Sequence, residues 1–130
     1  MSAAEEERLL EAARAAIRRA YAPYSKFRVG SALLTHAGAI YSGCNVENAS
    51  YGLTNCAERS AIFAAVAAEG EQMKIRAIAV LTESGVPCSP CGACRQVIFE
   101  FGDKAIVLFQ GKKGLQKLSA AELLPAGFEF

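Results

Sequence analysis

The sequence has no tryptophan, a single histidine (His36) and no apolar run long enough to span a membrane. Its polar start, MSAAEEERLL, lacks the apolar segment of a secretory signal peptide. The 14 basic and 13 acidic residues are well mixed, so there is no basic stripe of the kind that displaces counterions from nucleic-acid phosphates. We therefore expect a cytoplasmic protein that binds neither membranes nor nucleic acid.

A complete disulfide framework is also absent, because the five cysteines are an odd number. Disulfides rarely persist in the cytosol, so cysteines there indicate metal binding or catalysis. The length predicts a single domain, residues 1–130, with a continuous core. The mean hydropathy of +0.20 is high for a small soluble monomer, which favours a buried subunit interface.

Apolar periodicity and turn residues predict nine elements in the order α-β-β-α-β-α-β-β-α. The first is a helix that begins at a Ser2–Glu5 capping box and ends near Tyr21, before Pro23. The others are strands at 29–34 and 39–44, a helix at 57–68, a strand at 75–81, a helix at 91–101, strands at 105–109 and 115–118, and a helical turn at 120–124. Apolar strands that alternate with helices predict an α/β fold with parallel crossovers.

The segment VPCSPCGACRQV, residues 86–97, places Cys88, Cys91 and Cys94 at two overlapping C-x-x-C spacings. That spacing fits a redox dithiol, a structural metal clip or part of a catalytic metal site. We predict that Ser89 caps the following helix and that Pro90 takes its first position. Cys91 and Cys94 then lie three residues apart on one helical face.

A second segment, TNCAERSAI at 54–62, has the same character. Asn55 is the predicted N-cap and Glu58 its capping-box partner, which puts Cys56 in the first turn of a buried helix. A helix N-terminus lowers the pKa of a thiol, and the thiolate is the form that binds metal. Because ligand sites form where helices follow strands at one edge of a sheet, we expect Cys56 to meet Cys91 and Cys94 there.

Three sulfurs around a tetrahedral zinc ion leave one position open, which is typical of a catalytic site. His36 lies in a predicted hairpin turn and is a poor fourth ligand. Zinc in an open site makes bound water acidic, and Glu58 is placed to take the proton. Three thiolates leave the zinc centre with a negative charge, which we expect Arg59 to offset through contact with a ligand sulfur.

Two alternatives use the same cysteines differently. A thioredoxin-like dithiol would need Cys91 and Cys94 but not Cys56. A structural zinc knuckle that adds Cys88 as a fourth ligand would leave Glu58 without a role. Cys44 and Cys88 are interpreted as small packing residues.

The segments CAE at 56–58 and PCGAC at 90–94 form the three-cysteine version of the zinc-deaminase signature. Together with YAPYSKFRVGSALL, GCNVENASYGLTNCAERSAI and ELLPAGF, they make the chain similar to the small homotetrameric cytidine deaminases over nearly its whole length. The resemblance implies a three-layer α-β-α cytidine-deaminase-like fold with a mixed five-stranded sheet. It also implies that the zinc pair is the one followed by Arg95 and Gln96, with one zinc ion per chain.

The activity implied by the resemblance is the hydrolysis of cytidine and deoxycytidine to uridine and deoxyuridine, with release of ammonia, in pyrimidine salvage. Zinc-bound hydroxide would attack C4 of the base, with Glu58 as the proton shuttle. Asn45 and Glu47 would hold the ribose, whose 2′- and 3′-hydroxyls can both donate to a carboxylate. The base would pack on Phe27.

The remaining implied contacts are less direct. The backbone of Ala57 and Ser89 would read the pyrimidine edge, and a homotetramer would lend side chains between sites. The residues lent to a neighbouring site would be Ala49, Tyr51 and Phe130. Alternative functions are an aminonucleoside deaminase of the blasticidin type, a nucleic-acid editing deaminase and a zinc-binding module without catalysis.

Overall fold

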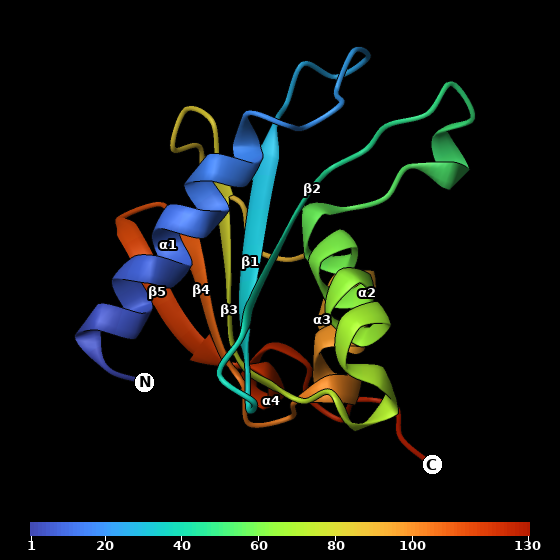
Figure 1. Cartoon of the computed structure of the whole chain (residues 1–130). Helices are drawn as coiled ribbons and strands as arrows, with labels where there is room; N and C mark the ends of the chain where they lie inside the picture. Colours follow the sequence, from blue (N-terminus) through green and yellow to red (C-terminus); the bar gives the residue numbers. More distant parts are fainter.

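The computed structural model describes all 130 residues and contains one five-stranded sheet with the order β2-β1-β3-β4-β5 (Figure 1). The predicted order of the nine strands and α-helices is confirmed, and two short 3-10 helices are added. The elements are α1 (Ala3–Ile17), β1 (Val29–Thr35), β2 (Ile40–Cys44), η1 (Tyr51–Leu53), α2 (Ala57–Glu69), η2 (Gly70–Gln72), β3 (Ile75–Thr82), α3 (Gly92–Phe101), β4 (Ile106–Gly111), β5 (Gly114–Ser119) and α4 (Ala120–Leu123). None of the helices has the length and apolar character that crossing a membrane requires.

The sheet is mixed, as expected. Strand β1 is antiparallel to both β2 and β3, so β2 and β3 run in the same direction on either side of it. Strands β3 and β4 are parallel, and β5 is antiparallel to β4. The β3-α3-β4 unit is therefore the single parallel crossover between neighbouring strands. Because β2 and β3 share a direction, the segments that lead from them into α2 and α3 leave the sheet at the same edge.

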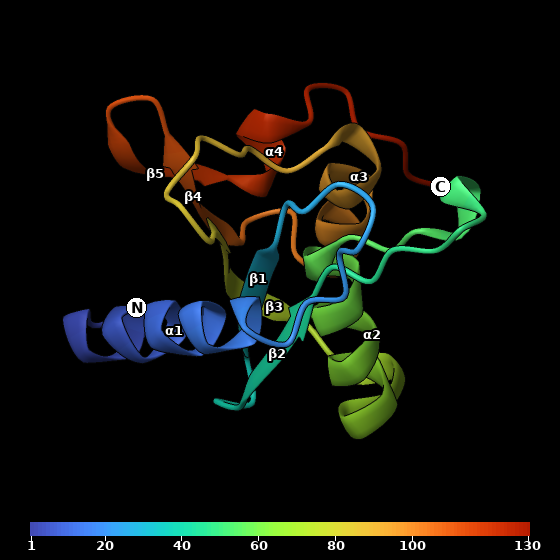
Figure 2. The same ribbon diagram turned by 90° about the horizontal axis from the view of Figure 1, so that it is seen from above.

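Helices cover both faces of the sheet, which gives the three expected layers (Figures 1 and 2). Successive residues of β3 alternate between the two faces, as the period of a strand requires. Ala77 and Ala79 belong to the core beneath α1, whereas Ile78 and Val80 belong to the core beneath α2 and α3. A strand that is buried on both faces has a continuous apolar sequence, and this pattern predicted β3.

Helix α1 ends at Ile17, earlier than predicted, because the chain around Tyr21 has other partners. Tyr21 forms an isolated bridge with Val46, in which its N–H donates to the Asn45 carbonyl (3.0 Å) and its carbonyl accepts from the Glu47 N–H (2.8 Å). This pairing joins the loop after α1 to the loop after β2. Both loops extend beyond the same end of the sheet in Figure 1.

Helices α2 and α3 begin at different caps from those predicted. The N-caps are Cys56 and Cys91, not Asn55 and Ser89, so Pro90 lies before α3. The backbone of Asn55 is already paired with Val46 in a second bridge, which keeps it extended. Each N-cap sulfur consequently sits beside the free amides of a helix N-terminus.

Candidate active site

Three cysteine sulfurs converge at the N-termini of α2 and α3. The Sγ atoms of Cys56, Cys91 and Cys94 all lie within 4.8 Å of one another, and those of Cys56 and Cys91 are 4.0 Å apart. Cys94 is buried, Cys56 is half-buried and Cys91 is exposed. The cluster is therefore anchored in the protein on one side and open to solvent on the other.

The spacing of the sulfurs fits a tetrahedral metal ion. A Zn–S bond of about 2.3 Å places two ligand sulfurs about 3.8 Å apart, close to the Cys56–Cys91 distance. No histidine, aspartate, glutamate or further cysteine joins the group. Cys88 lies outside it, and His36 is exposed in the turn between β1 and β2. The donor set is thus three thiols with a free fourth side, which suits zinc.

The hydrogen bonds around Cys56 favour its thiolate form. The pKa of the Cys56 thiol is held below its usual range, chiefly because the Cys94 thiol donates a hydrogen bond to it and further because Arg59 does. The pKa of Cys94 is correspondingly raised by this shared proton and by burial. A metal ion that displaces the shared proton would find one thiolate already formed.

Arg59 contacts the cluster directly. Its Nη2 donates a hydrogen bond to the Cys56 Sγ at 3.2 Å, the type of contact that the sequence predicted. The pKa of its guanidinium is raised by the same interaction, so the side chain stays charged. Its Nε is buried and has no hydrogen-bond partner. The orientation of the guanidinium is thus set largely by sulfur.

Glu58 lies in the first turn of α2, and its side chain is only 4% exposed. Burial raises its pKa to about 6, and the negative charge at Cys56 adds to the effect. The predicted capping box with Asn55 is absent, since α2 has no side-chain capping hydrogen bond. The carboxyl group is therefore free for another role, at a pKa close to neutrality.

The two residues expected to hold a ribose both bind the segment that leads into β1 and the first residue of that strand. Glu47 is 9% exposed and accepts hydrogen bonds from the Tyr24 N–H (2.9 Å), the Ser25 N–H (3.1 Å) and the Ser25 hydroxyl. Asn45 accepts from the Val29 N–H (2.9 Å) and donates to the Phe27 carbonyl (2.8 Å). Both side chains thus have structural partners.

A cavity of about 380 Å³ opens beside Glu47. Its other lining residues are Tyr24, Ser25, Tyr51 and Thr54. The rings of Tyr24 and Tyr51 meet edge to face, with centroids 6.0 Å apart. The cavity combines a buried acid, hydroxyl groups and aromatic walls, which are suitable partners for a polar ring-containing ligand.

The other predicted site residues are placed separately. Phe27 is 37% exposed and Ala57 is buried at the start of α2, whereas Ser89 is exposed. The three residues expected to reach a neighbouring chain all lie on the surface: Ala49, Tyr51 and Phe130. Their exposure is compatible with contacts between subunits, and their roles stay predictions.

Arg95 is a structural residue of the site that the sequence analysis named only as a family marker. Its Nε donates to the Pro90 carbonyl (2.7 Å), Nη1 to the Leu123 carbonyl (3.1 Å) and Nη2 to the Ser89 hydroxyl (3.3 Å). It therefore ties the loop before Cys91 to α4. The position directly after the last cysteine of the cluster was the only available signal.

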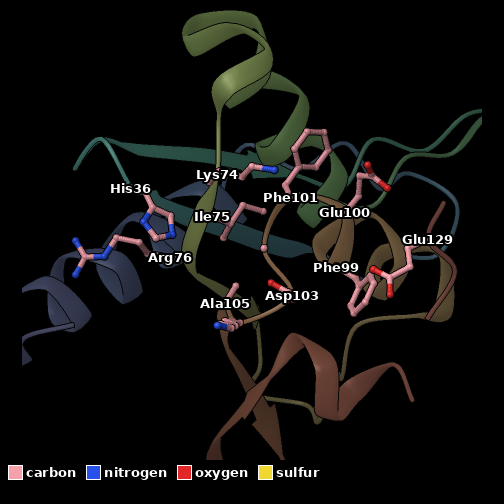
Figure 3. A pocket seen from close by; sticks show the side chains of 12 residues that line it. His36, Lys74, Ile75, Arg76, Phe99, Glu100, Phe101, Asp103, Ala105 and Glu129 are labelled. Atoms are coloured by element: carbon pink, nitrogen blue, oxygen red, sulfur yellow. The ribbon is translucent and has the colours of Figure 1, made fainter. Parts of the chain in front are cut away.

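A cavity of about 460 Å³ lies away from the cysteines (Figure 3). It is lined by the start of β3 and the end of α3, whereas the cysteines lie at the other end of α3. Figure 3 shows His36 and Arg76 on one side of it and Glu100 and Glu129 on the other. Its charges balance and no cysteine lines it, so it is separate from the sulfur cluster.

Known proteins share both this sequence and this fold. The family model described as the cytidine and deoxycytidylate deaminase zinc-binding region matches residues 3–110. The cytidine deaminase of Sporosarcina psychrophila is 48% identical over 124 residues, which cover 94% of this chain and 90% of the relative. The crystal structure of cytidine deaminase from Burkholderia pseudomallei superposes with a TM-score of 0.85 at 50% identity, covering 98% of this chain and 100% of that one.

A relative with another substrate in its name is more distant. The blasticidin-S deaminase of Bacillus cereus is 32% identical over 108 residues, which cover 78% of this chain and 76% of the relative. The family match spans the cysteine cluster and Glu58 together, and the fold agrees with the solved structures over almost the full chain. The chain therefore belongs to the cytidine and deoxycytidylate deaminase family of zinc-dependent hydrolases.

Proposed function

We propose that the chain deaminates cytidine and 2′-deoxycytidine by hydrolysis, to uridine and 2′-deoxyuridine with release of ammonia. The observation that carries the proposal is the buried Glu58 in the same helical turn that presents Cys56 to the sulfur cluster. The relatives named as cytidine deaminases support the choice of substrate.

We assign Cys56, Cys91 and Cys94 as ligands of one zinc ion per chain. When bound, the zinc supplies Lewis acidity and lowers the pKa of water at its open position. Arg59 offsets part of the negative charge of the three thiolates through its hydrogen bond to Cys56. Because Cys91 is exposed, water and substrate can reach the proposed metal site from its side.

Glu58 is the proposed proton shuttle. Its carboxylate takes a proton from the attacking water, delivers one to N3 of the pyrimidine, and then assists protonation of the departing amino group. Water adds to C4 and the C4–N4 bond breaks, so the products are the uracil nucleoside and ammonia. Burial of Glu58 keeps these transfers away from bulk solvent.

The nucleoside is proposed to lie between the cluster and the cavity beside Glu47. Glu47 would accept hydrogen bonds from the sugar hydroxyls, and the amide of Asn45 would form a further hydrogen bond with the sugar. Phe27 would contact the base. The backbone of Ala57 and Ser89 would read the edge of the pyrimidine. Glu47 supports this placement because it is buried yet lines the cavity.

We further propose a homotetramer that acts in pyrimidine salvage in the cytoplasm. Tyr51 and Phe130 are highly exposed aromatics, and surface aromatics of this kind favour burial against a second chain. With Ala49, they would complete the site of a neighbouring subunit. Five free cysteines fit a reducing compartment.

An ultraviolet assay of cytidine loss, with and without a zinc chelator, tests the activity. Glu58→Gln is expected to keep one zinc per chain and the wild-type melting temperature but to lose at least about 100-fold in turnover, as for removal of a general acid–base. Glu11→Gln, an exposed acid of α1, is the control. Ammonia release at the wild-type rate from Glu58→Gln would overturn the assignment of Glu58 as the proton shuttle. No ammonia release from the wild-type protein would leave only a zinc-binding module. Faster turnover of blasticidin S than of cytidine would instead favour an aminonucleoside deaminase of the blasticidin type.

A further inference from the structure

Both oxygens of the Glu47 carboxylate already accept hydrogen bonds from the chain. Oε1 accepts from the Tyr24 N–H at 2.9 Å and the Ser25 N–H at 3.1 Å, and Oε2 accepts from the Ser25 hydroxyl. A carboxylate offers about four acceptor sites, two on each oxygen. One site on Oε2 therefore remains, and its direction depends on the bond from Ser25.

The same hydroxyl also reaches the backbone of Phe27. Ser25 Oγ accepts a hydrogen bond from the Phe27 N–H at 3.0 Å while its own proton goes to Glu47. Between the two residues, Lys26 adopts a left-handed conformation, with φ of +62°, which turns the chain sharply around the hydroxyl. One oxygen atom thus joins the acid expected at the sugar to the aromatic residue expected at the base.

These donors also fix the charge of Glu47. The Ser25 hydroxyl and the two backbone amides hold its pKa below the ordinary carboxyl value. An ionised carboxylate accepts hydrogen bonds and donates none, so its free site selects a ligand with a donor such as a sugar hydroxyl. Ser25 and Glu47 both line the cavity of about 380 Å³.

We infer that Ser25 is a positioning residue for the nucleoside, which acts through Glu47. Its hydroxyl aims the remaining acceptor site of Oε2 at a sugar hydroxyl. The inference rests on the proposed function, because that function supplies the nucleoside. It assigns to Ser25 an effect that depends on the sugar hydroxyls of the substrate.

The test compares cytidine with 2′,3′-dideoxycytidine, which lacks both hydroxyls that Glu47 can accept from. Ser25→Ala is expected to raise KM for cytidine about 10- to 100-fold, the effect of misplacing one charge-assisted hydrogen bond, with kcat changed less than about threefold. For 2′,3′-dideoxycytidine, measured as substrate or competitive inhibitor, the change is expected to stay below about threefold. Ser25→Thr, which keeps the hydroxyl, should restore most of the affinity.

Two further variants separate positioning from general damage to the loop. The double variant Ser25→Ala/Glu47→Gln is expected to be no worse than Glu47→Gln, because residues that act through one another are not additive. Ser84→Ala removes the hydroxyl of an exposed serine that makes no side-chain hydrogen bond, and should behave as wild type. Melting temperature and zinc content are measured for each protein.

The outcomes are distinct. Equal losses on cytidine and 2′,3′-dideoxycytidine, or additive effects in the double variant, would reduce Ser25 to a structural residue and overturn the inference alone. A wild-type protein that releases no ammonia from cytidine would overturn the proposed function, and the inference with it.

Discussion

The guanidinium of Arg59 and the sulfur of Cys56 form a hydrogen bond within the first turn of α2, with Nη2 3.2 Å from Sγ. Cation and proposed metal ligand therefore belong to the same rigid element. The charge that we propose to offset the thiolates is therefore carried by a helix and not by a loop. This contact makes the electrostatics of the cluster accessible to mutation.

Arg59→Ala is expected to lower kcat for cytidine by about 10- to 100-fold while about one zinc per chain is retained, since one charge-assisted hydrogen bond to a ligand is lost but no ligand is. Elemental analysis and steady-state kinetics give the two values. Arg8→Ala, an exposed arginine of α1 with no ion pair, is the matched control. Wild-type kcat in Arg59→Ala would show that its charge has no part in the reaction.

Cysteine variants inside and outside the sulfur cluster should differ in bound zinc and in activity. Cys91→Ala is expected to reduce bound zinc to well below one per chain and to abolish turnover, because a two-sulfur site is incomplete. Cys88→Ala should keep both the zinc and the activity, since its sulfur lies outside the group. Zinc content after gel filtration is the measurement. Loss of zinc from Cys88→Ala would favour a closed four-cysteine site.

Glu47 should contribute to stability in a pH-dependent way. Its folded-state pKa lies below the ordinary value of 4.5, mainly because of the Ser25 hydroxyl, so the unfolded chain binds the proton at higher pH. The stabilisation is then fully present above about pH 4.5 and is lost as the pH falls through the folded-state value. In metal-free protein, the urea midpoint of Glu47→Gln should lie well below wild type at pH 7 and approach it at pH 4. Glu11→Gln should show no such convergence, and a constant gap for Glu47→Gln would contradict the linkage.

Gly43→Ala should destabilise the fold through the contact between β2 and α2. An added Cβ would lie 2.4 Å from the Ala61 nitrogen and 2.8 Å from the Ala57 carbonyl, both of them backbone atoms. We expect a loss of about 1–3 kcal/mol in the free energy of unfolding, the usual cost of overpacking. Gly52→Ala, where an added Cβ meets nothing within 4 Å, is the control. Equal urea midpoints for the two variants would show that β2 can shift away from α2.

The strands and helices were predictable because their signals are local. The continuous apolar run of β3 and the Ser2–Glu5 capping box depend on neighbours in sequence, and both are confirmed. Capping boxes also explain the correct position of α4, where Ser119 and Glu122 bond reciprocally. Apolar patterns and capping residues were therefore sufficient to predict most of the strands and helices.

The errors arose where distant segments compete for the same groups. Asn55 is a good N-cap by type, but its backbone is paired with Val46, and Ser89 instead accepts from Arg95. The bond between Ser25 and Glu47 spans 22 positions, so no local pattern announces it. The cysteine cluster was found because two helix starts could be placed at one sheet edge from the order of elements.

The position of β1 between β2 and β3 affects how the cysteine cluster is assembled. Cys56 and Cys91 are 35 positions apart, and the strands that lead to them do not touch. Strand β1, which comes earlier in the sequence, lies between them and determines the distance between β2 and β3. We therefore expect the sulfurs of Cys56 and Cys91 to reach the spacing that zinc requires only when β1 has paired with both β2 and β3.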